Sequence, residues 1–306
     1  MIRLGLCCLF REAPIRFRTT TVKSTARLNR QEQLNKLNQL CLGNASALND
    51  AVSFCAENGI GAFRVNSQIL PLKTHSDVGY DVKDLPDSDE IISCFKAAER
   101  LRKKHDVRLS FHPDQFVVLN SPRPDVVTSS IKELAYQAEV AKWIGADVLN
   151  IHGGGAYGNK QEALEQLTVT VQKLPKSIRT LLTFENDDRT FTPSDLLPVC
   201  RETGVPLVYD VHHHRCLPDG LSEKEATEAA LTTWNREPLF HISSPKNGWS
   251  NGEDPKPHSD LIEPADFPAC WDQLDITVEV EAKAKEPAII ALRDALKKKK
   301  VPVWTG

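Results

Sequence analysis

Residues 204–214 read GVPLVYDVHHH, a short apolar run followed by an aspartate and, one residue later, three consecutive histidines. The apolar part is typical of a buried strand, and the polar part begins where that strand would end. A strand rarely ends in this way for packing reasons alone. The pattern therefore predicts a strand that carries Asp210 and one histidine, His213, toward a functional site, with His212 and His214 beside that site or on the surface.

Short apolar runs of this kind alternate with longer amphipathic stretches along the whole chain. We predict strands at 2–7, 62–67, 107–113, 147–153, 181–187, 206–212, 239–244 and 276–282. Residues 87–105 and 125–145 have the pattern of amphipathic helices, and Gly145 is placed to end the second one. Apolar strands separated by helices indicate a parallel sheet covered by helices.

Eight such units in 306 residues predict an α/β fold of the (β/α)8 type, a TIM barrel. A doubly wound sheet is the alternative, although no GxGxxG motif follows the first strand. We find no linker-like stretch and no strong internal repeat. The expected organisation is therefore one domain over residues 1–306, with its active site at the carboxyl ends of the strands.

The composition and charge narrow the class of protein. The net charge of −3 gives no general basic excess, but residues 11–30 hold six basic side chains and one acidic one. Such an arm could contact phosphates, or it could be a solvated loop. Eight scattered cysteines without a CxxC pair predict reduced thiols in the cytoplasm, and no stretch approaches the roughly 20 apolar residues of a membrane helix. We expect a monomer.

Metal-ligand side chains stand at or just after the predicted strand ends. They are His112, His152, Glu185, Asp210, His213, His241 and Glu281, with His258 added from the loop after the seventh strand. One buried histidine is usually an ordinary core residue, but recurrence on six consecutive strands favours a shared site. Eight ligands exceed the three or four of one catalytic zinc, so we expect two or three divalent ions.

Closely spaced metal ions suit in-line displacement at phosphorus. A phosphodiester substrate would also account for the basic arm after the first strand. The loop at 243–260 holds Lys246, Trp249 and Lys256, a mixture that could follow a nucleic-acid backbone and stack on a base. An ordinary long loop is the simpler interpretation of the same residues.

Several motifs in this order resemble one known family. They are HPDQF (112–116), NIHGGGAYGNK (150–160), FENDDR (184–189), GVPLVYDVHHH (204–214), HISSPK (241–246) and VEVEAKAKE (278–286). Together they resemble the UV damage endonucleases, which are relatives of the endonuclease IV type of abasic-site nuclease. The resemblance implies a (β/α)8 barrel, the same eight ligands, and up to three ions, with Mn²⁺ expected and Mg²⁺, Zn²⁺ or Co²⁺ as alternatives.

The resemblance also implies roles for individual residues. His75 would handle a proton or contact phosphate beside the metals, and Asp210 and His213 would be catalytic as well as ligating. Gln115 and Phe116 would probe the damaged bases, and Tyr157 and Lys160 would line the groove. Arg16, Arg18 and Lys246 are the further candidates for DNA contacts.

The implied reaction is hydrolysis of the phosphodiester immediately 5′ to a UV photoproduct, a cyclobutane dimer or a 6-4 product, which leaves a 3′-hydroxyl. Damaged double-stranded DNA would be the partner, abasic sites would be further substrates, and the enzyme would work at the nucleoid. Two positions depart from the family pattern. Leu239 stands where many members carry a modifiable lysine, and Leu6 stands where some carry a tyrosine near the active site.

Three alternatives remain open from the sequence. A sugar isomerase or epimerase can also place acidic and histidine ligands on the strand ends of a barrel, but the basic arm would then lack a purpose. A non-catalytic damage-binding protein is motivated by Leu239 and Leu6. A nuclease specific for abasic sites would use the same chemistry. Nicking and DNA-binding assays on defined duplexes distinguish all three.

Overall fold

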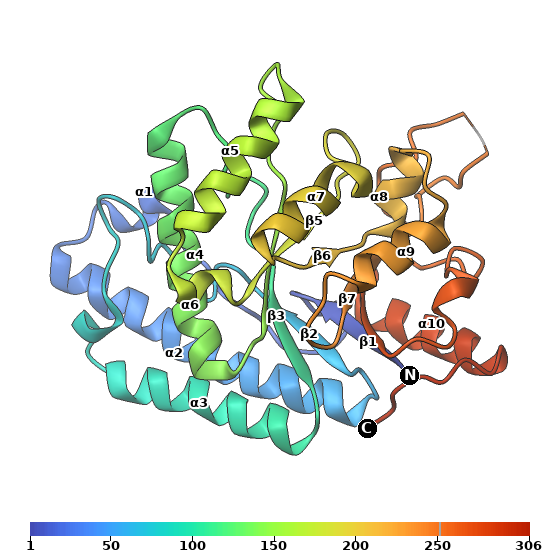
Figure 1. The fold of residues 1–306 in the computed structure, drawn as a ribbon. Helices are drawn as coiled ribbons and strands as arrows, with labels where there is room; N and C mark the ends of the chain where they lie inside the picture. Colours follow the sequence, from blue (N-terminus) through green and yellow to red (C-terminus); the bar gives the residue numbers. More distant parts are fainter. Residues whose placement is uncertain (251) are drawn as a thin grey trace.

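Eight parallel strands form the centre of the protein, and helices pack around them (Figure 1). The computed structural model describes residues 1–250 and 252–306. The strands are β1 (Ile2–Cys7), β2 (Ala62–Val65), β3 (Arg108–Phe111), β4 (Val148–His152), β5 (Leu182–Glu185), β6 (Leu207–Val208), β7 (Leu239–Ile242) and β8 (Ile276–Val280). Each lies within one of the predicted runs, so all eight predicted strands are confirmed.

The strands follow one another around a barrel. Their order is β6-β5-β4-β3-β2-β1-β8-β7, and each ladder is parallel. The end strands β6 and β7 meet through an isolated bridge between Asp210 and His241, where the His241 amide donates to the Tyr209 carbonyl at 3.0 Å. This bridge nearly closes the ring. The (β/α)8 barrel is therefore confirmed, and the doubly wound sheet is wrong.

Helices connect the strands and cover the outside of the barrel. They are α1 (Val22–Thr25), α2 (Arg30–Glu57), α3 (Ser88–Lys104), α4 (Pro124–Ile144), α5 (Lys160–Lys173), α6 (Lys176–Arg179), α7 (Pro193–Thr203), α8 (Val211–Cys216), α9 (Glu223–Leu231) and α10 (Glu286–Lys298), with short 3-10 turns η1 (Val82–Asp84) and η2 (Ala269–Trp271). The two predicted helices are confirmed as α3 and α4, and Gly145 ends α4 with a left-handed φ of 69°. In the described part of the chain, no helix has both the length and the apolar character of a membrane span.

The strand predicted at 206–212 is much shorter than expected. β6 ends at Val208 because Asp210 is the N-cap residue of α8, where its Oδ1 accepts a hydrogen bond from the His213 amide at 2.8 Å. The three histidines therefore belong to a helix rather than to a strand end. Successive helical residues point in different directions, which sends only one of the three toward Asp210.

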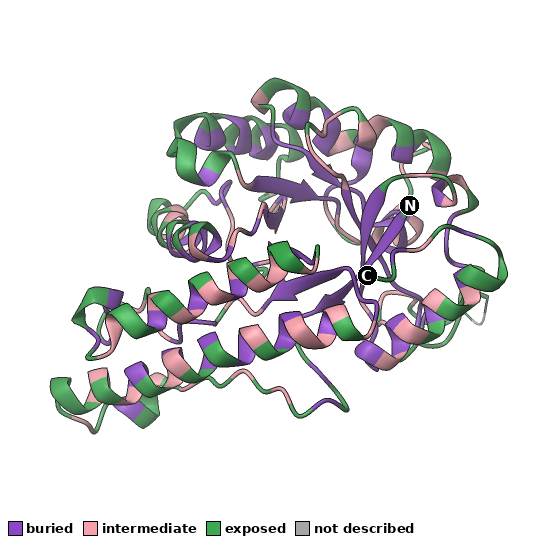
Figure 2. Cartoon of the chain, turned by 90° about the horizontal axis from the view of Figure 1, so that it is seen from below, coloured by how far each residue is buried: buried purple, intermediate pink, exposed green. Residues whose placement is uncertain are grey.

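Along β7, and from β6 into the residues that follow it, buried side chains change from apolar to charged. Leu239 is fully buried and packs with Val208, while two residues further along the same strands come His241 and Asp210. Leu239 therefore supplies apolar packing and no ligand. Leu6 is likewise fully buried within the main hydrophobic core. Figure 2 shows that the strands and the inward faces of the helices hold the buried residues.

Candidate metal centre

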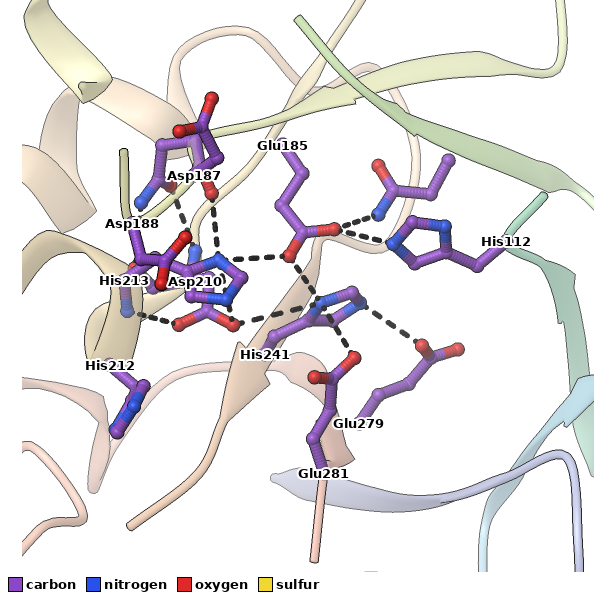
Figure 3. Close-up of polar contacts among 12 residues, drawn as sticks. His112, Glu185, Asp187, Asp188, Asp210, His212, His213, His241, Glu279 and Glu281 are labelled. Atoms are coloured by element: carbon purple, nitrogen blue, oxygen red, sulfur yellow. Dashed lines mark hydrogen bonds and ion pairs between the residues drawn. The ribbon is translucent and has the colours of Figure 1, made fainter. Parts of the chain in front are cut away.

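The carboxyl ends of the strands bring seven of the eight predicted ligands into one cluster. Figure 3 labels all of these except His152. Three triads have ligand atoms within 4.8 Å of one another: a first of His112, His152 and Glu185, a second of Glu185, Asp210 and His213, and a third of Asp210, His241 and Glu281. Glu185 belongs to two triads and so does Asp210, so the triads run side by side. His258 lies at the edge of the third triad, with its Nδ1 3.7 Å from Glu281 Oε2.

Glu185 is the central carboxylate, and its surroundings hold it in one orientation. Its Oε2 lies 2.8 Å from His112 Nε2 and accepts a hydrogen bond from the Asn150 amide at 2.6 Å. Thr183 in turn donates to Asn150 Oδ1 at 2.9 Å. The other oxygen, Oε1, lies 3.1 Å from His241 Nδ1. The two oxygens therefore face different histidines, as a carboxylate shared by two triads requires.

Two of the histidines are oriented by backbone carbonyls. The Nδ1 of His112 lies 3.0 Å from the Pro113 oxygen, and the Nδ1 of His213 lies 2.9 Å from the Asn186 oxygen. A carbonyl can only accept, so each Nδ1 donates its proton there. Any second proton of these rings is therefore on Nε2, where a bound ion would replace it, because the neutral ring with a bare Nε2 is the form that binds a metal.

Buried polar atoms without a hydrogen-bond partner gather in this cluster. They include His152 Nδ1, Asp210 Oδ2 and His241 Nδ1, one or more in each triad. Buried polar atoms of this kind are normally paired, because an unpaired one costs free energy. A cation among these nitrogen and oxygen donors would pair them all. The residues present therefore fit a set of divalent ions.

The electrostatics of the cluster also favour cations. Burial opposes the ionisation of Glu185, but the charges of His241 and other neighbouring histidines lower its pKa well below the ordinary value. Burial also opposes protonation of His241, yet Glu185 and nearby carboxylates raise its pKa to about 10. Burial, with the neighbouring charges of His112 and His213, lowers the pKa of His152, although Glu185 opposes the shift. Glu185 thus stays ionised and attracts positive charge.

A cleft of about 1340 Å³ opens onto this cluster. Its lining includes His152 of the first triad together with Phe116 and Tyr157, whose side chains are 76% and 52% exposed. Lys160 is not among the lining residues, because its ammonium group pairs with Asp195 at 2.8 Å. The cleft thus joins exposed aromatic side chains to the candidate ligands.

His75 and Gln115 also line the cleft. The Nδ1 of His75 accepts a hydrogen bond from the Asp77 amide at 3.1 Å, so the proton of the neutral ring must be on Nε2. His75 can therefore offer an N–H group to a substrate in the cleft. The role beside the metals that the family resemblance implies for His75 stays a prediction.

The predicted DNA-binding cations lie outside the lining of the cleft. Arg16, Arg18 and Lys246 are exposed, and the cleft is lined instead by residues 19–21 of the same basic arm. The guanidinium group of Arg16 bonds to the carbonyls of its own arm, that of Ala13 among them. Contacts from these cations to a long duplex remain a prediction.

The neighbours of His213 in the histidine triplet have other partners. His214 lies between Tyr209, whose hydroxyl is 2.8 Å from Nδ1, and Asp219, whose Oδ1 is 2.9 Å from Nε2. His212 packs against the ring of Trp249, with centroids 5.2 Å apart. Both histidines are buried, so a surface position is wrong for either. Neither belongs to a triad.

We expect Asp219→Asn to destabilise the fold at neutral pH. Asp219 accepts bonds from the Ser194 amide at 2.7 Å, the Leu221 amide at 3.0 Å and His214. Although burial opposes it, the bond from Ser194 and the others hold the pKa of Asp219 well below its ordinary value. A lowered carboxyl pKa stabilises the fold above the unfolded pKa of about 4, and the contribution is lost as the pH falls further.

Urea unfolding of both proteins at pH 7 and pH 3 measures this effect. The variant should lose about 1.5–3 kcal/mol of unfolding free energy at pH 7, and the difference should shrink at pH 3. Asp294→Asn, on the surface of α10, is the control and should change little. Equal stability of Asp219→Asn and wild type at pH 7 would contradict the assignment.

Two charged residues of the cluster were missed by the sequence reasoning. Glu279 is 2% exposed, with its Oε2 3.1 Å from His241 Nε2, and Arg64 lies 2.7 Å from Glu281. Glu279 lies on β8 and Glu281 directly follows its last residue, so the two are two apart in extended chain and point to the same side. The spacing of two residues from the predicted ligand Glu281 could therefore have predicted that Glu279 faces the same cluster. An arginine inside a four-residue apolar strand gave no comparable signal.

A family model described as UV-endonuclease UvdE matches residues 2–304. The chain belongs to this family. The UV DNA damage endonuclease of Deinococcus radiodurans is 36% identical over 307 residues, covering 95% of this chain and 94% of the relative. That of Bacillus velezensis is 33% identical over 303 residues, covering 94% of this chain and 91% of the relative. The resemblance in the motifs is confirmed, and membership places the chain among the DNA endonucleases, which are hydrolases.

Solved structures agree with this family membership. The crystal structure of SacUVDE matches with a TM-score of 0.86 at 27% identity, covering 99% of this chain and all 100% of SacUVDE. Endonuclease IV from Thermus thermophilus matches with a TM-score of 0.62 at 15% identity, covering 97% and 99%. A D-psicose 3-epimerase from Clostridium cellulolyticum matches with a TM-score of 0.55 at 13% identity, covering 83% and 93%. The last two likenesses show a shared fold alone.

Proposed function

We propose that this member of the UvdE family is a metal-dependent DNA repair endonuclease. It hydrolyses the phosphodiester immediately 5′ to a UV photoproduct, a cyclobutane dimer or a 6-4 product, and leaves a 3′-hydroxyl; abasic sites are further substrates. The observation that carries the proposal is the row of three triads, joined through Glu185 and Asp210, at the end of the cleft. The family relatives named for UV DNA damage support the choice of substrate.

Two or three divalent ions, Mn²⁺ in this proposal, would supply Lewis acidity at the phosphoryl group. The eight candidate ligands would hold these ions. Asp210 and His213 would be catalytic because they hold ions that act on the reacting phosphoryl group. His75 would donate its Nε2 proton, as a hydrogen bond to the phosphate or to the leaving oxygen. The buried network around Glu185 keeps the ligands fixed, so that little reorganisation accompanies the reaction.

Recognition would take place at the exposed end of the cleft. A photoproduct weakens the stacking of its bases, which lowers the cost of moving the damaged nucleotides out of the helix. Phe116 and Gln115, which line the cleft, would contact the opened duplex, and Tyr157 would stack on a displaced base. Because the enzyme would recognise how easily the DNA duplex deforms rather than which bases it carries, it would accept chemically different lesions. We place this activity in the cytoplasm, at the nucleoid, and expect a monomer.

A nicking assay tests the proposal directly. End-labelled duplexes with one cyclobutane dimer, one abasic site or no damage are incubated with the protein and Mn²⁺. We expect a cut 5′ to the dimer that a chelator abolishes, and no cut in undamaged DNA. Cutting at the abasic site alone would indicate an enzyme of the endonuclease IV type. No cutting, with a gel shift on the dimer, would indicate a damage-binding protein.

A further inference from the structure

A buried ion pair lies next to the third triad, between Arg64 of β2 and Glu279 of β8. The two residues are 7% and 2% exposed. Arg64 Nε donates to Glu279 Oε2 at 2.5 Å, and the Ser110 hydroxyl donates to the other oxygen. Neither residue belongs to a triad, and the proposed reaction assigns a role to neither. Burying two charges costs desolvation free energy, so a specific role is needed to explain the pair.

Glu279 contacts the triad through His241. The two residues are register partners on β7 and β8, and His241 Nε2 lies 3.1 Å from Glu279 Oε2. The other ring nitrogen, Nδ1, lies 3.1 Å from Glu185 Oε1 and 3.5 Å from Glu281 Oε1. His241 therefore has one nitrogen toward the ligand carboxylates and one toward Glu279.

The two nitrogens cannot both carry the proton of a neutral ring. A nitrogen that binds a metal is unprotonated, so a ligating Nδ1 requires the proton on Nε2. Arg64 Nη2 is 3.0 Å from Nε2 and can donate to that nitrogen only while it carries no proton, because a guanidinium group has no acceptor. Once Nδ1 binds an ion and the proton is on Nε2, this bond is no longer possible. Glu279 Oε2 is thus the acceptor available to the Nε2 proton.

Arg64 acts on the carboxylates on both sides. It pairs with Glu279 Oε2, and its Nη2 also lies 2.7 Å from Glu281 Oε1. Glu281 Oε2 is left facing His258, with its Nδ1 3.7 Å away. One guanidinium group thus fixes the carboxylate that orients His241 and the carboxylate that completes the third triad.

We infer that Glu279 and Arg64 are positioning residues for the ion of the third triad. Glu279 holds His241 as the Nε2–H tautomer, and Arg64 fixes the orientations of Glu279 and Glu281. The inference rests on the metal-dependent activity proposed above, because it concerns the same cluster.

Metal titration of the full-length, metal-free protein tests the inference. Isothermal titration calorimetry with Mn²⁺ gives the number of ions and their affinities for wild type, Glu279→Gln and Glu279→Asp. We expect Glu279→Gln to lower the binding affinity for one ion by about 10- to 100-fold and to leave the affinities for the other ions unchanged. Glu279→Asp keeps the charge and should recover most of that loss. A role in packing alone would make the shorter aspartate the worse replacement.

A second readout reports the tautomer itself. Long-range ¹H–¹⁵N NMR spectra of protein labelled in histidine, with Zn²⁺ bound, distinguish an Nε2–H ring from an Nδ1–H ring. His241 should be Nε2–H in wild type and should lose this preference in Glu279→Gln. If Glu279→Gln does not fold, Arg64→Lys replaces it, and the Mn²⁺ affinity of one ion should fall by about 10-fold or more.

Glu237→Gln is the matched control, because Glu237 also pairs with a buried arginine, Arg3, at the opposite end of the barrel. It should bind ions like wild type. Ion affinities and a His241 tautomer that are the same in wild type and Glu279→Gln would overturn the inference and leave the proposed function standing. If wild type itself binds no divalent ion, the proposed function fails, and the inference fails with it.

Discussion

Asp210→Asn should lower the rate of nicking at a UV photoproduct by at least about a thousandfold, which is about 4 kcal/mol of activation free energy. Asp210 belongs to two of the three triads, and its Oδ2 is buried without a hydrogen-bond partner. Asparagine keeps an oxygen to accept the bond from the His213 amide, so the N-cap of α8 survives. The change therefore removes the charge and one ligand oxygen with little effect on the fold.

Single-turnover nicking of a duplex with one cyclobutane dimer, at saturating enzyme and Mn²⁺, measures this loss. Asp275→Asn is the control, because Asp275 is exposed and pairs with the chain terminus at the far end of the barrel. Both variants should keep the melting temperature of the metal-free wild type. A rate for Asp210→Asn within about tenfold of the Asp275→Asn rate would remove Asp210 from the ligand set.

Phe116→Ala should weaken binding to a damaged duplex by about 5- to 150-fold, the range that corresponds to about 1–3 kcal/mol for an aromatic ring that stacks on a base. The ring is 76% exposed beside the cleft, so its removal leaves no cavity in the core. An exposed aromatic side chain of this size has no evident role in stability. Its loss should therefore act on DNA and not on folding.

Fluorescence anisotropy with labelled duplexes, in the absence of divalent ions, measures binding without cleavage. Damaged and intact duplexes are compared for Phe116→Ala, for Gln115→Ala, and for Leu261→Ala, which alters an exposed apolar residue outside the cleft lining. We expect the first two to lose preference for damage and the third to keep it. An equal loss on damaged and intact DNA would show that Phe116 contacts the duplex without probing the lesion.

The barrel and most of the candidate centre were predictable because both follow from local patterns. A strand of the kind seen in β4 or β5 is a short apolar run, and a parallel barrel collects the ends of all its strands on one face. His152 and Glu185, the last residues of those strands, therefore came together without any knowledge of the loops. The same rule identified Asp210, although the strand it follows is only two residues long.

The remaining features depend on contacts between distant parts of the chain. Arg64 and Glu279 are 215 residues apart, and no local pattern pairs them. The basic arm was expected to bring Arg16 and Arg18 to the site, but the path of the arm brings residues 19–21 to the cleft. The position of the Lys160 side chain also depends on a distant residue, because its partner Asp195 comes from another helix. Positions of long, exposed side chains are set by tertiary neighbours rather than by sequence period.

The bridge between Asp210 and His241 has a consequence for the mechanics of the protein. Seven junctions in the ring of strands are ladders, whereas the junction between β6 and β7 is held by this one bridge. The two bridging residues are also members of one triad, so a cation held between them would bind across the weakest seam of the ring. Ligand binding and closure of the circumference would then be thermodynamically linked. The metal-bound, active form of the enzyme would then also be the form in which the junction between β6 and β7 is most stable.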